Sequence, residues 1–125
     1  MDEIERRIVL PPGAYPMESY IRKYRSSGPD EITAIYVLPD NPLPPGVSCT
    51  VSYDNNVREC TPEEVERMYR DDARHMSLQP PAGTRLWLPT GDIMPMMIDG
   101  GCAMITVNYR ISTKRVKSVE CNSIG

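Results

Sequence analysis

Hydrophobic and polar residues alternate over residues 103–111, a pattern that predicts an antiparallel strand with one buried face. A turn over residues 112–115 and a return strand over residues 116–121 are expected to complete a hairpin. Residues 32–38 are β-branched and apolar on both faces, which is typical of a central strand. Residues 85–88 predict a further short strand. Together these segments favour a sheet that is mainly antiparallel.

Another hairpin is expected where residues 47–53 and 57–60 flank the Asp-Asn-Asn sequence at positions 54–56. Asp and Asn tolerate the left-handed backbone conformation that a tight hairpin turn requires. The segment before this hairpin, residues 39–46, contains four prolines and is therefore expected to be a rigid connector.

A capping box marks the start of the longest expected helix. Thr61 suits the N-cap, Pro62 suits the first helical position, and Glu64 is placed to return a hydrogen bond to Thr61. The helix is expected to end at about Met76 or Ser77. Its predicted buried stripe consists of Val65, Met68, Tyr69, Ala73 and Met76.

Two shorter helical segments are predicted near the N-terminus. Residues 2–9 favour a short helical turn with Ile4 and Ile8 on one side. Pro16 suits the first position of a helix over residues 17–25, in which apolar and aromatic residues recur at three- and four-residue spacing.

These elements predict an α+β fold, in which a mainly antiparallel sheet of about four to six strands in hairpins packs with two helices. A chain of 125 residues favours a single domain over residues 1–125. Hydrophobic residues make up 40% of the chain, so it should fold. The chain has seven Tyr, eight Met and no Phe, so Tyr and Met are expected to fill the core.

A net charge of −3 argues against a broad nucleic-acid or anionic-membrane footprint, but it leaves room for a local basic patch. The candidate interaction residues lie on the last hairpin and are Arg110, Lys114, Arg115 and Lys117. A second group is Arg22, Lys23 and Arg25. Such groups suit an acidic partner or lipid headgroups. Ordinary surface charge is the favoured interpretation, because no aromatic residues are interleaved.

No apolar run reaches the roughly 18 to 20 residues that a membrane-spanning helix needs. The N-terminal residues also lack the apolar core of a signal peptide. Two interpretations follow: a cytoplasmic protein, or a periplasmic or secreted protein whose export signal has been removed. The cysteines favour the second.

The chain has four cysteines that fall as two pairs, each bracketing a predicted hairpin: Cys49 with Cys60, and Cys102 with Cys121. A two-residue turn at 54–55 places Cys49 opposite Cys60, whereas a turn at 55–56 places Cys60 opposite Val51. The second pair requires a bulge or a diagonal bridge. Pairing within each hairpin is preferred among three connectivities, and four buried free thiols are the alternative.

The sequence gives only weak support for a metal site or for catalysis. The cysteine spacing is unlike that of structural zinc sites. Met94, Met96 and Met97 carry thioethers that suit Cu(I), although core packing is the favoured role. His75 is the only histidine, and no nucleophile motif accompanies it. We therefore expect a non-enzymatic protein without a cofactor.

A resemblance to small uncharacterised bacterial envelope proteins, often made with an export or lipoprotein signal, is carried by three segments. The sequence Asp-Gly-Gly-Cys at 99–102 is followed by Ile-Thr-Val-Asn-Tyr at 105–109 and by Arg-Val-Lys-Ser-Val-Glu-Cys-Asn at 115–122. The resemblance implies an envelope location and no activity. Residues 41–81 have no counterpart in it, which suggests an inserted hairpin–helix segment within the single domain. The resulting hypothesis is an interaction module that binds a protein or envelope component, and the alternative is a small-ligand or Cu(I) carrier using residues 94–97.

Overall fold

The computed structural model describes residues 1–89 and 100–122 of the chain. The chain divides into two compact units. The first unit comprises Met1–Pro39 and the chain from Pro80 onward, and the second unit comprises Asp40–Gln79. Each unit has its own sheet, and the two are described separately below.

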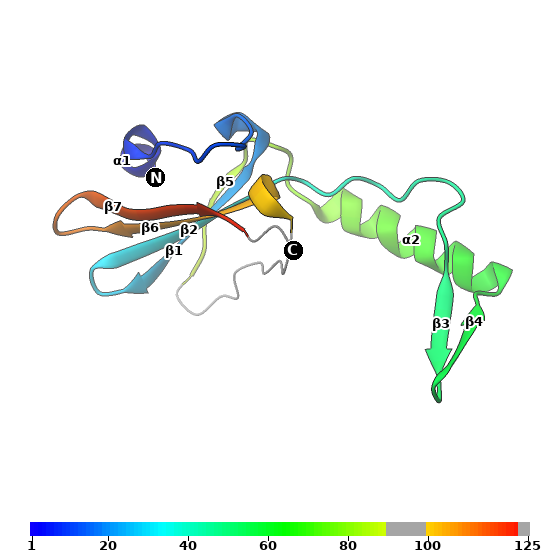
Figure 1. The fold of residues 1–125 in the computed structure, drawn as a ribbon. Coiled ribbons are helices and arrows are strands. Elements are labelled where there is room, and N and C mark those ends of the chain that lie inside the picture. The colour runs from blue at the N-terminus through cyan, green and yellow to red at the C-terminus, as the bar shows by residue number, and fades with distance from the viewer. Residues whose placement is uncertain (90–99, 123–125) are drawn as a thin grey trace. The chain divides into compact units, whose positions relative to one another are not determined.

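The first unit is built on a five-stranded sheet with the strand order β5-β1-β2-β6-β7 (Figure 1). Its strands are β1 (Ile21–Gly28), β2 (Glu31–Val37), β5 (Arg85–Trp87), β6 (Met104–Arg110) and β7 (Arg115–Cys121). Strand β5 runs parallel to β1, and the other neighbours are antiparallel. The predicted α+β class with a mainly antiparallel sheet is therefore confirmed.

Strand β2 is central, as its two-sided apolar pattern predicts. It pairs with β1 on one side and with β6 on the other, and its successive residues Ala34, Ile35 and Tyr36 are all buried. Strand β6 buries the alternating residues Ile105, Val107 and Tyr109. These alternating side chains point to the same face of the sheet.

The prediction of a helix over residues 17–25 is wrong. A single 3-10 turn, η1 (Met17–Ser19), follows Pro16, and the chain then enters β1. Tyr20 and Tyr24 are fully buried, Arg22 is 8% exposed and Ile21 is 3% exposed, so the start of this segment is buried as an inner strand is. Pairing with β2 and β5 along this segment stabilises the strand more than local helical spacing stabilises a helix.

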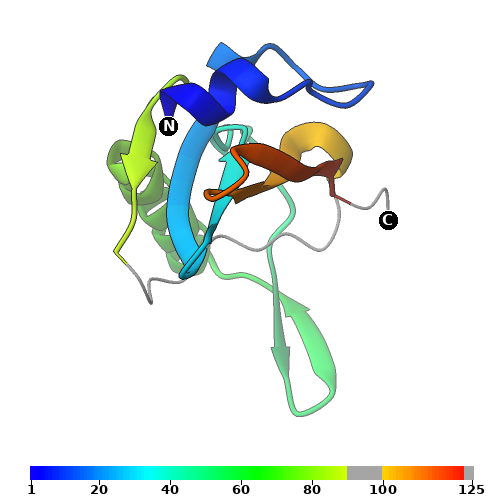
Figure 2. The same ribbon diagram turned by 90° about the vertical axis from the view of Figure 1, so that its left-hand side faces the viewer.

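Helix α1 (Asp2–Arg7) covers one face of the sheet (Figure 2). Its Ile4 is 2% exposed and joins the core, as the predicted N-terminal helical turn requires. The buried cluster around it consists of Ile4, Tyr20, Tyr24, Ala34, Tyr36, Ile105, Val107 and Tyr109. Tyrosine thus takes much of the core volume that Phe fills in other proteins.

The carboxylate of Glu5 connects α1 to two strands. It accepts hydrogen bonds from Arg22 Nη1, from Tyr24 Oη at 2.5 Å and from Arg85 Nε at 2.9 Å. The side chains of Arg22 and Glu5 are only 10% and 12% exposed. A buried carboxylate is tolerated where cations and hydrogen-bond donors surround it. We call Glu5, Arg22, Tyr24 and Arg85 the Glu5 cluster.

A tyrosine pair extends the Glu5 cluster to β2. The Tyr24 and Tyr36 hydroxyls lie 2.6 Å apart. Because the Tyr24 proton is donated to Glu5, the Tyr36 hydroxyl donates to the Tyr24 oxygen. Burial raises the pKa of Tyr36 to about 12 and raises the pKa of Tyr24 still further. Both tyrosines therefore remain neutral donors at physiological pH.

Replacing Glu5 should destabilise the first unit. Glu5→Gln leaves Arg22 and Arg85 without their shared anion, and we expect a loss of about 3 kcal/mol in the free energy of unfolding. Urea denaturation followed by Trp87 fluorescence measures this, because Trp87 is the only tryptophan and stacks on Tyr24 at a centroid distance of 6.4 Å.

Glu3→Gln is the matched control on the same helix. Glu3 pairs with Arg7 at the surface, where its side chain is 40% exposed, and its loss should change stability by no more than about 0.5 kcal/mol. Equal effects of the two substitutions would contradict a structural role for the Glu5 carboxylate.

The second unit contains helix α2 (Pro62–Leu78) and a two-stranded sheet of β3 (Thr50–Tyr53) and β4 (Asn56–Glu59). The predicted capping box is confirmed at Thr61 and Glu64. No residue of this unit is buried. The predicted stripe of α2 is correspondingly only half-buried, and its Ala73 is exposed.

Hydrogen bonds join α2 to the proline-rich connector before the hairpin. Tyr69 Oη donates to the Pro44 carbonyl at 2.8 Å and accepts from Val47 N at 3.2 Å. Asp72 accepts from Leu43 N at 3.0 Å. Hydrogen bonds, more than a buried core, therefore hold this unit together.

Candidate interaction surfaces

The β3–β4 hairpin is closed at its base by a disulfide. Cys49 and Cys60 are bridged with their Cα atoms 5.5 Å apart, and Cys60 N donates to the Cys49 carbonyl at 3.1 Å. The turn residues Asp54 and Asn55 have φ values of 45° and 63°. Of the two alternatives considered from sequence, the turn at 54–55 is therefore the one that forms.

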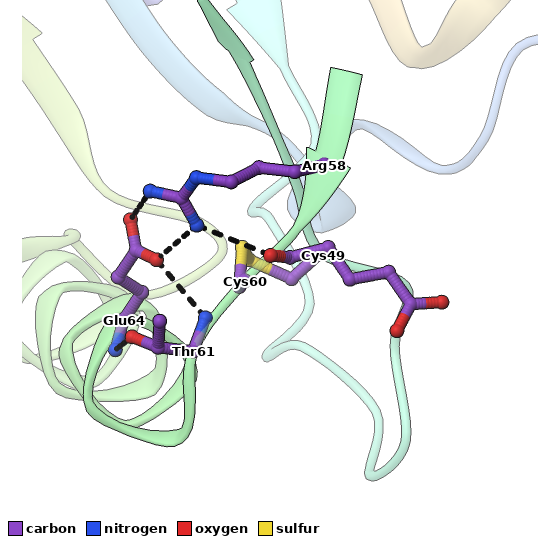
Figure 3. The surroundings of a disulfide bond; sticks show 6 residues. Cys49, Arg58, Cys60, Thr61 and Glu64 are labelled. Carbon is purple, nitrogen blue, oxygen red and sulfur yellow. Dashed lines mark hydrogen bonds and ion pairs between the residues drawn. A yellow bond between two sulfur atoms is a disulfide. The ribbon is translucent and has the colours of Figure 1, made fainter.

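A second set of contacts joins the hairpin to the start of α2 (Figure 3). Arg58 binds both carboxylate oxygens of Glu64, with Nη1–Oε1 at 2.7 Å and Nη2–Oε2 at 3.2 Å. The same Glu64 accepts from Thr61 N at 2.9 Å. These hydrogen bonds, led by the one from Arg58, lower the pKa of Glu64 to about 2.

Above this base, the hairpin exposes apolar side chains on both faces. Tyr53 is 74% exposed and Val57 is 69% exposed. Alternation puts Val51, Tyr53 and Arg58 on one face and Val57 on the other. A surface pocket of about 390 Å³ is lined by Val51, Tyr53, Asn56 and Arg58. Sequence analysis missed Tyr53 and Val57 as binding candidates, although an aromatic residue beside an Asp-Asn turn was the available signal.

The second predicted disulfide, Cys102–Cys121, is also formed, with a Cα–Cα distance of 4.6 Å. Cys121 lies opposite Ile105, and a bulge interrupts the β6–β7 register at Asn108 and Tyr109. Cys102 precedes β6 in the 3-10 turn η2 (Gly101–Ala103), which starts after Gly100 at a φ of 108°. The bulge and the 3-10 turn together provide the irregular geometry that the sequence analysis expected this bridge to need.

The predicted basic residues of the last hairpin differ in their contacts. Lys117 forms an ion pair with Glu31 at 2.5 Å, and Arg110 lies opposite Arg115 in the β6–β7 ladder. Lys114 and Arg115 line a surface pocket of about 320 Å³. Its remaining lining residues are Arg7 and Val116, and we call these four residues the basic pocket.

The second predicted basic group lies on β1 and not on a helix. Arg22 belongs to the buried Glu5 cluster, so it is removed from the surface. Lys23 and Arg25 are half-buried. This group therefore does not form the exposed basic helix face that the sequence suggests.

The remaining candidates give no assembled site. Met94, Met96 and Met97 lie outside the described residues. His75 Nε2 lies 2.9 Å from Asp40 Oδ2 on an exposed surface. Within residues 1–89 and 100–122, no group of three or more His, Cys, Asp or Glu side chains is placed to hold a metal ion. None of the helices described there is long and apolar enough to cross a membrane.

Comparison of the chain with protein-family models, with curated proteins and with solved structures found no match in any of the three. The functional argument therefore rests on the geometry of the chain itself. Two surfaces stand out in that geometry: the exposed hairpin of the second unit and the basic pocket of the first.

The Arg58–Glu64 contact should be pH-sensitive. Because the folded-state pKa of Glu64 is depressed to about 2, its contribution to stability is present above the unfolded value near 4.5 and is lost as the pH falls through about 2. Titration of the Arg58 and Thr61 amide resonances by NMR should report this midpoint.

Glu64→Gln should remove the low-pH transition from both resonances while leaving the disulfide at Cys49–Cys60 intact. Glu66 is the matched control, because it pairs with Arg70 on the exposed surface of the same helix. If Glu66→Gln removes the transition as well, the assignment to Glu64 is wrong.

Proposed function

We propose that the protein is a non-enzymatic interaction module that binds a protein or cell-envelope component through its β3–β4 hairpin. One observation supports this most directly: the second unit buries no residue, yet it holds Tyr53 and Val57 in the open on a disulfide-bridged hairpin. Exposed aromatic and branched apolar side chains supply binding energy when a partner covers them.

Restraint of the hairpin supports the same proposal. The Cys49–Cys60 bridge, the Arg58–Glu64 ion pair and the capping box each limit the conformations of the unbound hairpin. A surface that is ordered before binding loses less conformational entropy in the complex, so more of its contact energy appears as affinity. Its pocket offers an apolar wall beside Tyr53 to a partner side chain, with the Glu64-paired guanidinium of Arg58 at its edge.

An envelope or extracellular location is part of the proposal. The two disulfides support it, because disulfides persist in oxidising compartments and are rare in the cytosol. The resemblance of residues 99–122 to bacterial envelope proteins motivates the same location. Together these considerations make an envelope extract the appropriate source of partners.

Photo-crosslinking tests the hairpin directly. A photoreactive amino acid at Ser52, which is exposed and lies opposite Val57, should form an adduct with a partner from a native envelope extract. Excess unlabelled wild-type protein should abolish the adduct. The double variant Tyr53→Ser, Val57→Ser should compete at least tenfold more weakly, because it lacks the apolar contacts.

Leu78→Ser is the matched competitor, since Leu78 is 74% exposed in the same unit but lies at the end of α2. It should compete as well as wild type. All variants should keep their melting temperature, because the replaced side chains are exposed. An absence of competable adducts, or equal competition by the double variant, would overturn the proposal.

A further inference from the structure

Three cationic side chains from distant parts of the sequence meet at the basic pocket. Arg7 comes from the last turn of α1, Lys114 from the turn between β6 and β7, and Arg115 from the first position of β7. Helix α1 lies beside β7 (Figure 1), and Val116 adds an apolar wall. The pocket is shallow and open to solvent, so a ligand there would be held mainly by the charges.

Contacts with Asp30 hold the β6–β7 turn in place. Ser112 donates to the Asp30 carboxylate through both its backbone N, at 2.8 Å, and its hydroxyl, at 2.6 Å. Ile111 N donates to the Asp30 carbonyl at 2.9 Å. The turn that carries Lys114 is thus anchored to the β1–β2 turn, so the backbone at this end of the pocket is held in place before any ligand arrives.

Lys114 occupies a backbone conformation that lysine seldom adopts. Its φ is 53°, in the left-handed region where Gly and Asn are the favoured residues. A lysine there costs stability relative to glycine, and such local costs concentrate at ligand-binding positions. Glycine would be the more stable residue at this position, so the presence of lysine indicates a role for its side chain.

The charges in this pocket are only partly compensated. Arg7 pairs with Glu3 at 3.1 Å. No ion pair between described residues involves Lys114 or Arg115. Both residues are exposed, so an incoming anion can reach them from solvent.

From this arrangement we infer that the basic pocket binds a phosphate group, carried either by a soluble small molecule or by a lipid headgroup. A phosphate dianion matches several converging cations better than a single carboxylate does. The planar guanidinium groups of Arg7 and Arg115 suit its oxygens, and Lys114 adds a compact point charge. The site lies on the first unit and stands independently of the function proposed for the β3–β4 hairpin.

Titration with inorganic phosphate at constant ionic strength, followed by the amide resonances of residues 113–116, tests the site. Wild type should show saturable shifts that chloride does not produce. Lys114→Gly and Lys114→Asn both keep a residue that tolerates the left-handed conformation, so they should fold and melt close to wild type. Each should weaken phosphate binding roughly three- to fivefold, as expected for loss of one exposed charge contact.

Arg110→Gln is the matched control, because it removes the same charge from the same hairpin but does not line the pocket. It should bind phosphate as tightly as wild type. Equal weakening by Arg110→Gln and Lys114→Asn would show a general charge effect and overturn the inference.

Vesicles distinguish the two sources of the phosphate. Wild type and Lys114→Asn are sedimented with vesicles of phosphatidylcholine alone and with vesicles that contain phosphatidic acid. Selective binding of wild type to phosphatidic acid, reduced in the variant, assigns the site to lipid headgroups. Saturable phosphate shifts without such binding assign it to a soluble ligand. Both results support a phosphate site, whereas wild type that shows neither excludes it.

Discussion

The Glu5 carboxylate accepts hydrogen bonds from Arg22, Tyr24 and Arg85, and in this way one side chain of α1 is joined to β1 and β5 together. A charge that is largely removed from water is stable only when all its partners are in place, so this cluster favours one position of α1 on the sheet. That position brings Arg7 to the β6–β7 turn. The basic pocket therefore depends on an ion-pair cluster with which it shares no residue.

The two units reach stability by different means. The first buries tyrosine and branched aliphatic side chains on one face of a five-stranded sheet, and the buried Tyr20 hydroxyl donates to the Cys102 carbonyl at 2.6 Å. The second spans only Asp40–Gln79 and buries no residue. Units of roughly 40 residues seldom form a sufficient core, and they usually depend on disulfides or similar restraints. The Cys49–Cys60 bridge and the capping box supply those restraints here.

Each proposed surface includes exposed residues that contribute little to the stability of the fold. Tyr53 and Val57 contribute little to the second unit, because most of each side chain faces solvent. Lys114 adopts a conformation in which glycine would be less strained. Natural proteins depart from the locally most stable choice of side chain chiefly at functional sites, which is why exposed apolar residues and strained backbone positions draw attention to a surface.

Interactions between residues close in sequence determined the features that sequence analysis predicted well. The capping box at Thr61, a tight turn within residues 54–56 and the Cys49–Cys60 bridge each depend on neighbours within a dozen positions. The choice of 54–55 over 55–56 for the turn was not determined by the sequence. Alternation likewise identified β6. Tertiary structure alone decided that residues 21–28 form β1, because their pairing partners β2 and β5 outweigh local helical spacing. Charge could name Lys114 and Arg115, but only the docking of α1 places Arg7 beside them.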